Sequence, residues 1–336
     1  MKKILIVLLV LLMAAGMAAF ANGAKEGTAA AQPSQSSDVA WPTKAIQVVV
    51  PAGAGGDTDL NSRILGKYLT KELGQPVVIV NVGGAGGTLG SRKVKDAAPD
   101  GNTVLFFHNG FLLNKLLGLA NYGLESFKVS AIAVMDNNNA FVTSGTSKYN
   151  SMKDVVAALK AKPMSVSFAT EVGSFTHLQV LSFEKAAGVK MNIVDVGGAA
   201  AKTAALLGDQ IDLIGTQLGL VRDYLKKGDF RGLAVASAER SPAFPNVPTF
   251  KEQGYDVEFS KFYFYAFPKD TPDAIVNKFS AAVEKVVNDP AYQKEIDAAL
   301  NATPTYMGPA KATAYIQNVD NEYNSFKDVI LSAQKK

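Results

Sequence analysis

The 336-residue sequence contains no cysteine, only two histidines and a single tryptophan. Without cysteine the chain has no disulfides, no thiolate metal ligands and no lipid-modified N-terminal cysteine. His108 and His177 lie far apart and show no metal-ligand spacing with carboxylates, so we predict no metal site and no cofactor. The formal net charge of +4 comes without a dense basic run interleaved with aromatics, so we predict no nucleic-acid partner.

Motifs for nucleotide binding and for hydrolysis are also missing. Two glycine-rich segments begin like G-x-G-x-x-G, but Thr58 and Leu89 stand where the sixth-position glycine belongs. Neither the phosphate-binding G-x-x-x-x-G-K-[ST] nor the nucleophile motif G-x-S-x-G occurs. We therefore predict a protein that is not an enzyme and name no catalytic residue. The rival hypothesis is a secreted enzyme that uses His108, which follows a predicted strand.

The N-terminus has the features of an export signal. Lys2 and Lys3 precede an apolar run over residues 4–13, and Ala19-Phe20-Ala21 is a small-x-small cleavage site. We predict a signal peptide over residues 1–21, cleaved on export to the periplasm, with an uncleaved membrane anchor as the alternative. Residues 22–40, rich in Ala, Gly, Ser and Gln, are predicted to form a flexible linker.

Two glycine-rich loops are the most informative feature of the chain. The first, Pro51–Asp59, follows the β-branched run Ile46–Val50, and the second, Asn81–Thr88, follows Val77–Val80. Glycine permits positive φ, which turns successive N–H groups into a concave nest, and a helix that begins there adds unpaired donors and a positive dipole end. We predict an anion site, for a carboxylate or phosphate, although each loop alone also fits a simple strand-to-helix turn.

From Trp41 onward, short β-branched runs alternate with longer amphipathic runs, a pattern typical of parallel strands joined by helices. We predict an α/β fold of two lobes linked by two crossing strands, one near Val134 and one near Phe264. Lobe 1 is predicted over residues 41–136 plus 265–336, and lobe 2 over residues 137–264. The ligand is expected in the cleft between them, at the carboxyl ends of the strands. The predicted helices cover Asp57–Leu73, Met152–Leu159, Ser174–Ala187, Ala199–Leu207, Pro272–Asn288 and Ala310–Leu331.

An ordered set of short motifs resembles the substrate-binding proteins of the tripartite tricarboxylate transporter family, the Bug-type periplasmic receptors. Each motif is weak alone, but their order and spacing over the whole mature domain are specific. They are residues 41–46, 51–59, 81–90, 99–101, 173–178, 208–212, 231–235 and 245–249.

The resemblance implies a periplasmic binding protein of type II, a Venus flytrap that binds but does not catalyse. In such receptors, backbone N–H groups and ordered waters of the two glycine loops hold a carboxylate. The implied partners are a small di- or tricarboxylate, or a related organic acid, and a membrane permease that receives it. We expect a monomer, and a sensory role remains a third hypothesis. The predicted ligand-binding residues are Gly55, Gly56, Asp57, Thr58, Asp59, Gly86, Gly87, Thr88, His108, Thr170, Gly173, Ser174, Gly197 and Gly198.

Several positions depart from the family pattern. Asp57 and Glu171 stand where small residues are common, and Ala52 and Ala54 replace the usual aromatic and proline. The two carboxylates fit an amine on the ligand, as in an amino acid. Alternatively, Asp57 caps its helix and Glu171 faces water.

Overall fold

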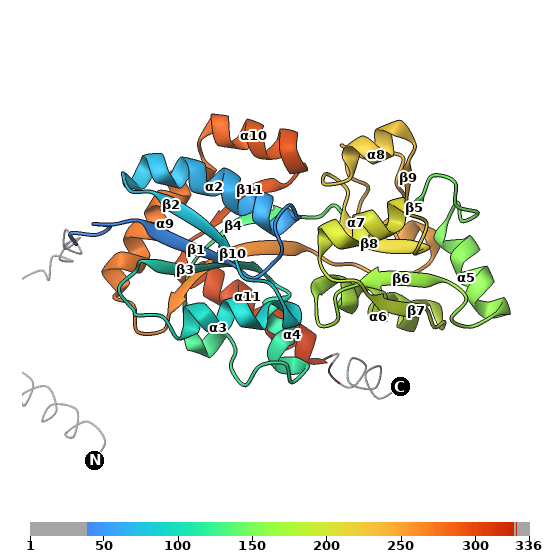
Figure 1. Ribbon diagram of the computed structural model, residues 1–336, viewed down its shortest axis with the longest axis horizontal. Helices are drawn as coiled ribbons and strands as arrows, with labels where there is room; N and C mark the ends of the chain where they lie inside the picture. Colours follow the sequence, from blue (N-terminus) through green and yellow to red (C-terminus); the bar gives the residue numbers. More distant parts are fainter. Residues whose placement is uncertain (1–38, 326, 328–336) are drawn as a thin grey trace, which may run out of the picture. The chain divides into compact units, whose positions relative to one another are not determined.

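The computed structural model describes residues 39–325 and 327 (Figure 1). The predicted signal peptide and nearly all of the predicted linker therefore lie outside the described residues. Among those that are described, no helix is both long enough and apolar enough to span a bilayer. The chain is a mixed α/β protein with two sheets, which we call sheet 1 and sheet 2.

Sheet 1 contains six strands in the order β11-β4-β10-β3-β1-β2. The strands β1, β2 and β3 are parallel, as predicted, but β10 and β11 pair antiparallel with their neighbours. Sheet 1 is therefore mixed, because the chain runs back into it after its excursion through sheet 2. The strands are β1 (Ile46–Val50), β2 (Val77–Asn81), β3 (Thr103–His108), β4 (Phe127–Asp136), β10 (Lys261–Pro268) and β11 (Thr303–Met307).

Sheet 2 contains five strands in the order β7-β6-β8-β5-β9. Here β6 is parallel to β7 and β8, whereas β5 is antiparallel to β8 and β9. The strands are β5 (Asn139–Ser144), β6 (Ser167–Thr170), β7 (Asn192–Asp195), β8 (Leu213–Gln217) and β9 (Phe230–Val235).

Most predicted helices are confirmed, and α2 and α7 have the predicted bounds. Gly74 ends α2 with φ 67°, a conformation that glycine adopts without strain. The helices are α2 (Asp57–Leu73), α3 (Thr88–Lys95), α4 (Phe111–Leu116), α5 (Met152–Ala161), α6 (Phe175–Ala187), α7 (Ala199–Leu207), α8 (Arg222–Lys227), α9 (Asp273–Val287), α10 (Pro290–Leu300) and α11 (Pro309–Ser325). The helix expected after the second glycine loop is α3, whereas four elements were not predicted from the sequence: α4, α8, α10 and β11.

The strand β10 occupies the middle of sheet 1 and is buried along its whole length. Its residues alternate between the two faces: Tyr263 and Tyr265 join one core cluster, and Phe262 and Phe264 join the other. Since both faces are covered, the strand is a continuous apolar run instead of an alternating one. Only its first residue, Lys261, is charged, and it lies where the strand enters the sheet.

The chain passes between the sheets at two places (Figure 1). After β4 it enters β5 through residues 137–138, and after β9 it returns to sheet 1 at Lys261. Asp136, the last residue of β4, pairs in register with Lys261, the first residue of β10. These two connections match the predicted crossings near Val134 and Phe264. We call each sheet with its packed helices a lobe, lobe 1 for sheet 1 and lobe 2 for sheet 2.

Candidate functional site

A polar cavity of about 70 Å³ lies between residues of both lobes. Three helices begin at its wall: α2 of lobe 1, and α6 and α7 of lobe 2. Helix starts leave backbone N–H groups without intrahelical partners and carry the positive end of the helix dipole. The lining residues are Ala52, Gly53, Gly56, Asp57, Thr58, His108, Asn139, Glu171, Ser174, Phe175, Thr176, Gly198, Ala199, Lys202, Gly215, Thr216, Gln217 and Lys261.

None of these three helix starts has a side-chain cap. The residues before the first turns are Gly56 for α2, Ser174 for α6 and Gly198 for α7, and none forms a side-chain cap hydrogen bond. Gly55, just before Gly56, has φ 78°, which lets the chain turn from β1 into α2. Uncapped N–H groups on a cavity wall are suited to hydrogen-bond an anion.

Lys202 supplies a buried positive charge beside these helix starts. It lies in α7 and is only 6% exposed. Its Nζ donates to Gly215 O at 2.7 Å and to Thr176 Oγ1 at 3.2 Å. Among the described residues, no carboxylate lies within ion-pair distance of this ammonium. Burial lowers the pKa of Lys202 to about 8, so the charge is present at neutral pH but is not neutralised.

A network of three hydroxyl groups positions the ammonium of Lys202. Thr176 Oγ1 lies 2.7 Å from Thr170 Oγ1 and 3.0 Å from Ser174 Oγ, so three hydroxyls of one turn are linked. Thr170 ends β6 and the other two begin α6. The network fixes Thr176, which in turn fixes the ammonium.

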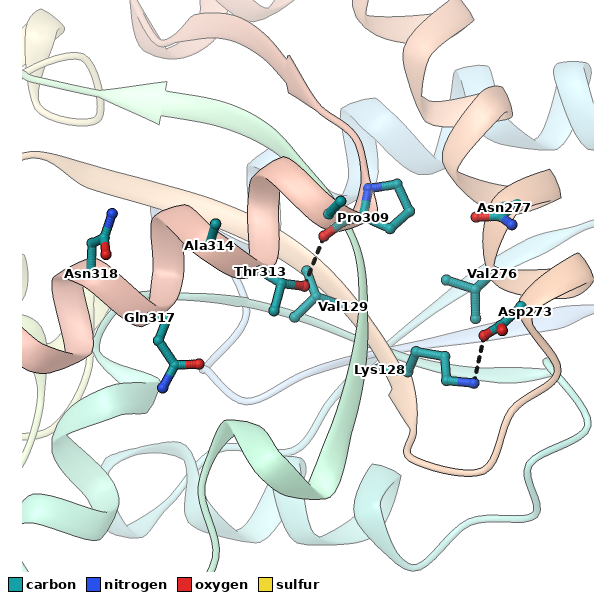
Figure 2. Close-up of a pocket in the computed structure, with 11 residues that line it drawn as sticks. Lys128, Val129, Asp273, Val276, Asn277, Pro309, Thr313, Ala314, Gln317 and Asn318 are labelled. Atoms are coloured by element: carbon teal, nitrogen blue, oxygen red, sulfur yellow. Dashed lines mark hydrogen bonds and ion pairs between the residues drawn. The ribbon is translucent and has the colours of Figure 1, made fainter. Parts of the chain in front are cut away.

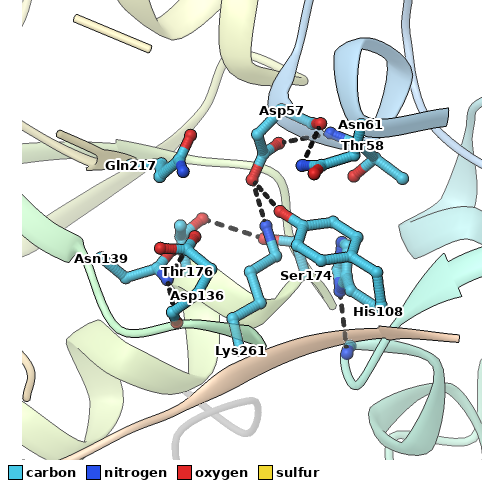
Figure 3. Close-up of polar contacts among 12 residues, drawn as sticks. Asp57, Thr58, Asn61, His108, Asp136, Asn139, Ser174, Thr176, Gln217 and Lys261 are labelled. Carbon is cyan, nitrogen blue, oxygen red and sulfur yellow. Dashed lines mark hydrogen bonds and ion pairs between the residues drawn. The ribbon is translucent and has the colours of Figure 1, made fainter. Parts of the chain in front are cut away.

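Lys261, the second buried lysine of the cavity, is neutralised within the chain. It is 5% exposed and forms an ion pair with Asp57, whose carboxylate also accepts the Tyr263 hydroxyl at 2.7 Å (Figure 3). The other oxygen of Asp57 accepts Thr58 N–H at 3.0 Å. Burial acts to raise the pKa of Asp57, but Lys261 and Tyr263 outweigh it and hold that pKa well below its usual range. Asp57 therefore stays ionised and fully engaged.

His108 lines the cavity without adding charge. Its Nδ1 accepts Gly110 N–H at 2.9 Å, which places the ring proton on Nε2. Burial, with the nearby Lys261 ammonium, holds the pKa of His108 well below its usual value. The ring is neutral at pH 7 and can offer one N–H to the cavity.

The second glycine loop lies outside the cavity lining. Its Gly86 N–H lies near the carboxylate of Glu171, which directly follows β6 in lobe 2, and acts to lower the pKa of that group, although burial outweighs it and raises the pKa. Gly87 precedes α3 with φ 91°, and the carbonyl of Thr88 accepts the Tyr122 hydroxyl at 2.8 Å. This loop is thus a contact between the lobes, and the carboxylate near it belongs to the chain itself.

Of the fourteen predicted ligand-binding residues, the structure brings six to the cavity. These are Gly56, Asp57, Thr58, His108, Ser174 and Gly198.

The other eight lie beside or behind the cavity. Asp59 accepts Gly55 N–H at 2.9 Å and holds the first loop in place. Gly173 N–H donates to His177 Nδ1 at 3.2 Å, so this histidine has a structural role. The eight are Gly55, Asp59, Gly86, Gly87, Thr88, Thr170, Gly173 and Gly197.

Sequence reasoning missed six polar residues of the cavity: Asn139, Thr176, Lys202, Thr216, Gln217 and Lys261. None belongs to a glycine loop. Lys261 carried a usable signal, because it is a lone charge at the start of an apolar strand. Lys202 carried a weaker one, as the only charged residue in the otherwise apolar or small α7.

The two open questions on the acidic residues are answered by contacts within the chain. Asp57 accepts an N–H of its own helix, as in the capping alternative, but its second oxygen is taken by Lys261 and Tyr263. Glu171 does not simply face water, because it lines the cavity and burial raises its pKa.

A larger hollow of about 610 Å³ lies on lobe 1 between β4, α9 and α11 (Figure 2). Its cation, Lys128, is paired with Asp273 at 2.7 Å and also donates to Thr271 O. With no uncompensated buried charge on its wall, this hollow is less suited to an anion than the polar cavity. Within residues 39–325 and 327, no cluster of three or more His, Asp or Glu is arranged to hold a metal ion.

Two lobes joined by two crossing connections, with a polar cavity at three helix starts, define a bilobal solute-binding protein. Residues 62–331 match the TctC family, described as the tripartite tricarboxylate transporter family receptor. The chain belongs to this family and is a Bug-type periplasmic solute-binding protein.

Three individual proteins are similar to this chain over most of its length. The chain is 32% identical to the protein BugT of Bordetella pertussis over 282 residues, which cover 82% of this chain and 86% of BugT. It is similar to the solved periplasmic binding protein BugD, with TM-score 0.81, 29% identity, and 86% and 98% of the two chains covered. MatC of Rhodopseudomonas palustris, solved with bound malate, gives TM-score 0.79 and 26% identity over 86% of this chain and 100% of MatC.

Proposed function

We propose that this protein captures a small carboxylate in the polar cavity and delivers it to a membrane permease of the tripartite tricarboxylate type. The observation that carries the proposal is Lys202, a buried ammonium without a carboxylate partner, beside three uncapped helix starts. The structure of MatC with bound malate supports a carboxylate as the ligand.

The binding step follows from electrostatics. A buried charge is costly unless it is paired, so Lys202 gains most from a ligand that brings a negative group. The N–H groups at the starts of α2, α6 and α7 complete the shell of a carboxylate, which accepts several hydrogen bonds at once. Because these helices come from both lobes, a bound anion favours the state in which the lobes are closed.

The sharpest test compares wild-type protein with Lys202→Met by isothermal titration, after ligand is removed by unfolding and refolding. The panel holds mono-, di- and tricarboxylates. For the ligand that binds best, Lys202→Met should weaken affinity about a hundredfold, since a charge-assisted contact in a closed site is worth roughly 2–3 kcal/mol.

A matched control is Lys160→Met, which removes an exposed lysine of α5 in the same lobe. It should leave affinity within about twofold. If no carboxylate shifts the melting temperature or gives a titration signal, the carboxylate proposal is wrong.

The proposal also covers two other steps: export of the protein and delivery of its ligand to the permease. We propose export through cleavage after Ala21, which N-terminal sequencing of the mature protein from the periplasm would test by finding Asn22 first. Delivery to the permease predicts that deletion of the gene abolishes uptake of the labelled ligand. Lobe boundaries at residues 136 and 264 stay a prediction; the end of β4 at Asp136 supports the first, whereas β10 of sheet 1 already begins at Lys261, before the second.

A further inference from the structure

The charges around the polar cavity limit how many anionic groups a ligand can carry. Two buried ammonium groups line it, Lys202 and Lys261. Asp57 already neutralises Lys261 through a direct ion pair. Lys202 is left as the one buried lysine of the described residues that lacks a carboxylate partner. The site therefore leaves one ammonium, that of Lys202, without a directly bound carboxylate.

A second carboxylate on the ligand would find no cation. The remaining charged group on the wall is Glu171, which is itself negative. A second anionic group would lie near Glu171 or near the engaged Asp57, and like charges at short range repel each other in a poorly solvated site. The carboxylate of Asp57 therefore occupies the partner position on Lys261 that a second carboxylate of the ligand would need.

A hydrogen-bond acceptor marks another part of the same wall. Gln217 ends β8 and is 1% exposed. Its Nε2 donates to Leu300 O at 2.8 Å, which fixes the orientation of the amide. Its Oε1 has no hydrogen-bond partner, although buried acceptors are rarely left unpaired. An amide oxygen accepts but cannot donate, so the missing partner is a donor.

The missing donor is best supplied by a neutral group. An ammonium on the ligand would need a free carboxylate, but Asp57 is held by Lys261, Tyr263 and Thr58. Asp136, near Lys261, accepts Asn138 N–H at 2.8 Å and Asn139 Nδ2 at 2.9 Å. A hydroxyl meets the amide oxygen of Gln217 without bringing a second charge that must be desolvated.

From these contacts we infer that the ligand is a small monocarboxylate that carries a hydroxyl group, with its carboxylate on Lys202 and its hydroxyl on Gln217. Asp57 is the residue that excludes dicarboxylates. This inference rests on the proposed function and narrows it to one substrate class.

The test measures affinities of refolded wild-type protein at pH 7 for four compounds of similar size. Lactate has the carboxylate and hydroxyl, propionate lacks the hydroxyl, alanine replaces it with an ammonium, and malate adds a second carboxylate. Lactate should bind at least tenfold tighter than each of the other three. Tighter binding of malate or alanine overturns the inference and leaves the carboxylate receptor standing, whereas no binding by any of a wider carboxylate panel overturns the receptor itself.

Two variants assign the preference to residues. Asp57→Asn keeps the shape and frees Lys261, so malate should gain at least tenfold relative to lactate. Gln217→Leu should bring the ratio of lactate to propionate affinity close to one. The control Asp273→Asn breaks the distant Lys128 ion pair and should leave all ratios unchanged.

Melting curves without ligand check that each variant is folded. The ranking on wild-type protein decides the substrate class even if a variant fails to fold. Unchanged ratios in folded Asp57→Asn overturn the assignment of specificity to Asp57.

Discussion

The two glycine-rich loops have similar sequences but different surroundings. Both follow a strand of sheet 1 and precede a helix of lobe 1. The first places Gly56, Asp57 and Thr58 on the polar cavity, where the start of α2 remains open to a ligand. The second lies against lobe 2, because a Cβ at Gly86 would be 3.2 Å from Gly173 O, and its Gly86 N–H is near the Glu171 carboxylate. A nest of N–H groups predicts that an anion binds there, but whether it is a ligand or a side chain depends on the facing lobe.

The two loops also differ in how tightly they are packed. A Cβ added at Gly53 in the first loop meets no atom within 4 Å, whereas one added at Gly87 in the second would clash with the ring of Phe107. The second loop is therefore built into the core of lobe 1, and the first is open. This difference predicts that mutations in the second loop act on stability and mutations in the first act on binding.

The largest expected effect is that of Gly87→Ala on stability. Gly87 has φ 91°, which is strained for any residue with a Cβ, and the added methyl group overlaps Phe107. Strain and overpacking together should lower the free energy of unfolding by about 3 kcal/mol in urea titrations. Gly53→Ala is the matched control and should change it by less than about 0.5 kcal/mol. Equal effects of the two variants would contradict the contrast between the loops.

The next largest effect is that of Gly56→Leu on affinity. A Cβ at Gly56 would lie 3.3 Å from the Cβ of Ala199 in the opposite lobe, and the rest of a leucine would fill the cavity. We expect affinity for the best ligand to fall about thirtyfold or more, equivalent to about 2 kcal/mol, with little change in urea stability. Ala201→Leu, on the exposed side of α7, is the control. Retained affinity would place the ligand elsewhere.

A third prediction concerns pH. The pKa of Lys202 is lowered to about 8 by burial, so its charge is present below that pH and is lost above it. Since a carboxylate binds the protonated form, the dissociation constant should rise about tenfold between pH 7 and pH 9. Titrations in Lys202→Met should show no such rise. A flat profile in wild-type protein would exclude Lys202 as the anchor.

The smallest expected effect is that of Glu171→Gln, which removes a partly buried charge near the second loop. Burial raises the pKa of Glu171, so its charged form is disfavoured in the folded chain, and ligand-free stability should rise slightly, by less than about 1 kcal/mol. Glu258→Gln, at an exposed position, is the control. If the variant instead changes affinity more than stability, the second loop belongs to the binding site.

Much of the fold could be predicted from local patterns. The bounds of α2 follow from its apolar stripe and from Gly74, and the buried β10 follows from its unbroken apolar run. The short helices α4 and α8 were missed, because six residues give no clear period. The antiparallel pairing of β10 and β11 was also missed, since strand direction depends on which strands meet after a long excursion.

The site was predicted less completely, for a physical reason. Glycine loops can be recognised from the local sequence because glycine is needed where φ is positive. Gly55 and Gly86 both have such angles. Lys202 and Lys261 lie far from those loops in sequence. The residues around each lysine do not indicate that both side chains line the same cavity. Their partners decide their roles: Asp57 neutralises one, and hydroxyl and carbonyl groups leave the other charged.

The sequence by itself determined the α/β pattern, the crossing strands and the two nests, because each depends on backbone preferences and apolar spacing within a few residues. Only the tertiary structure decided which nest meets a ligand, which lysine keeps a free charge and which acceptor lacks a donor. Those properties arise from groups up to two hundred residues apart, such as Asp57 and Lys261 with a sequence separation of 204. Their energies depend on burial and distance, which exist only once both lobes are folded.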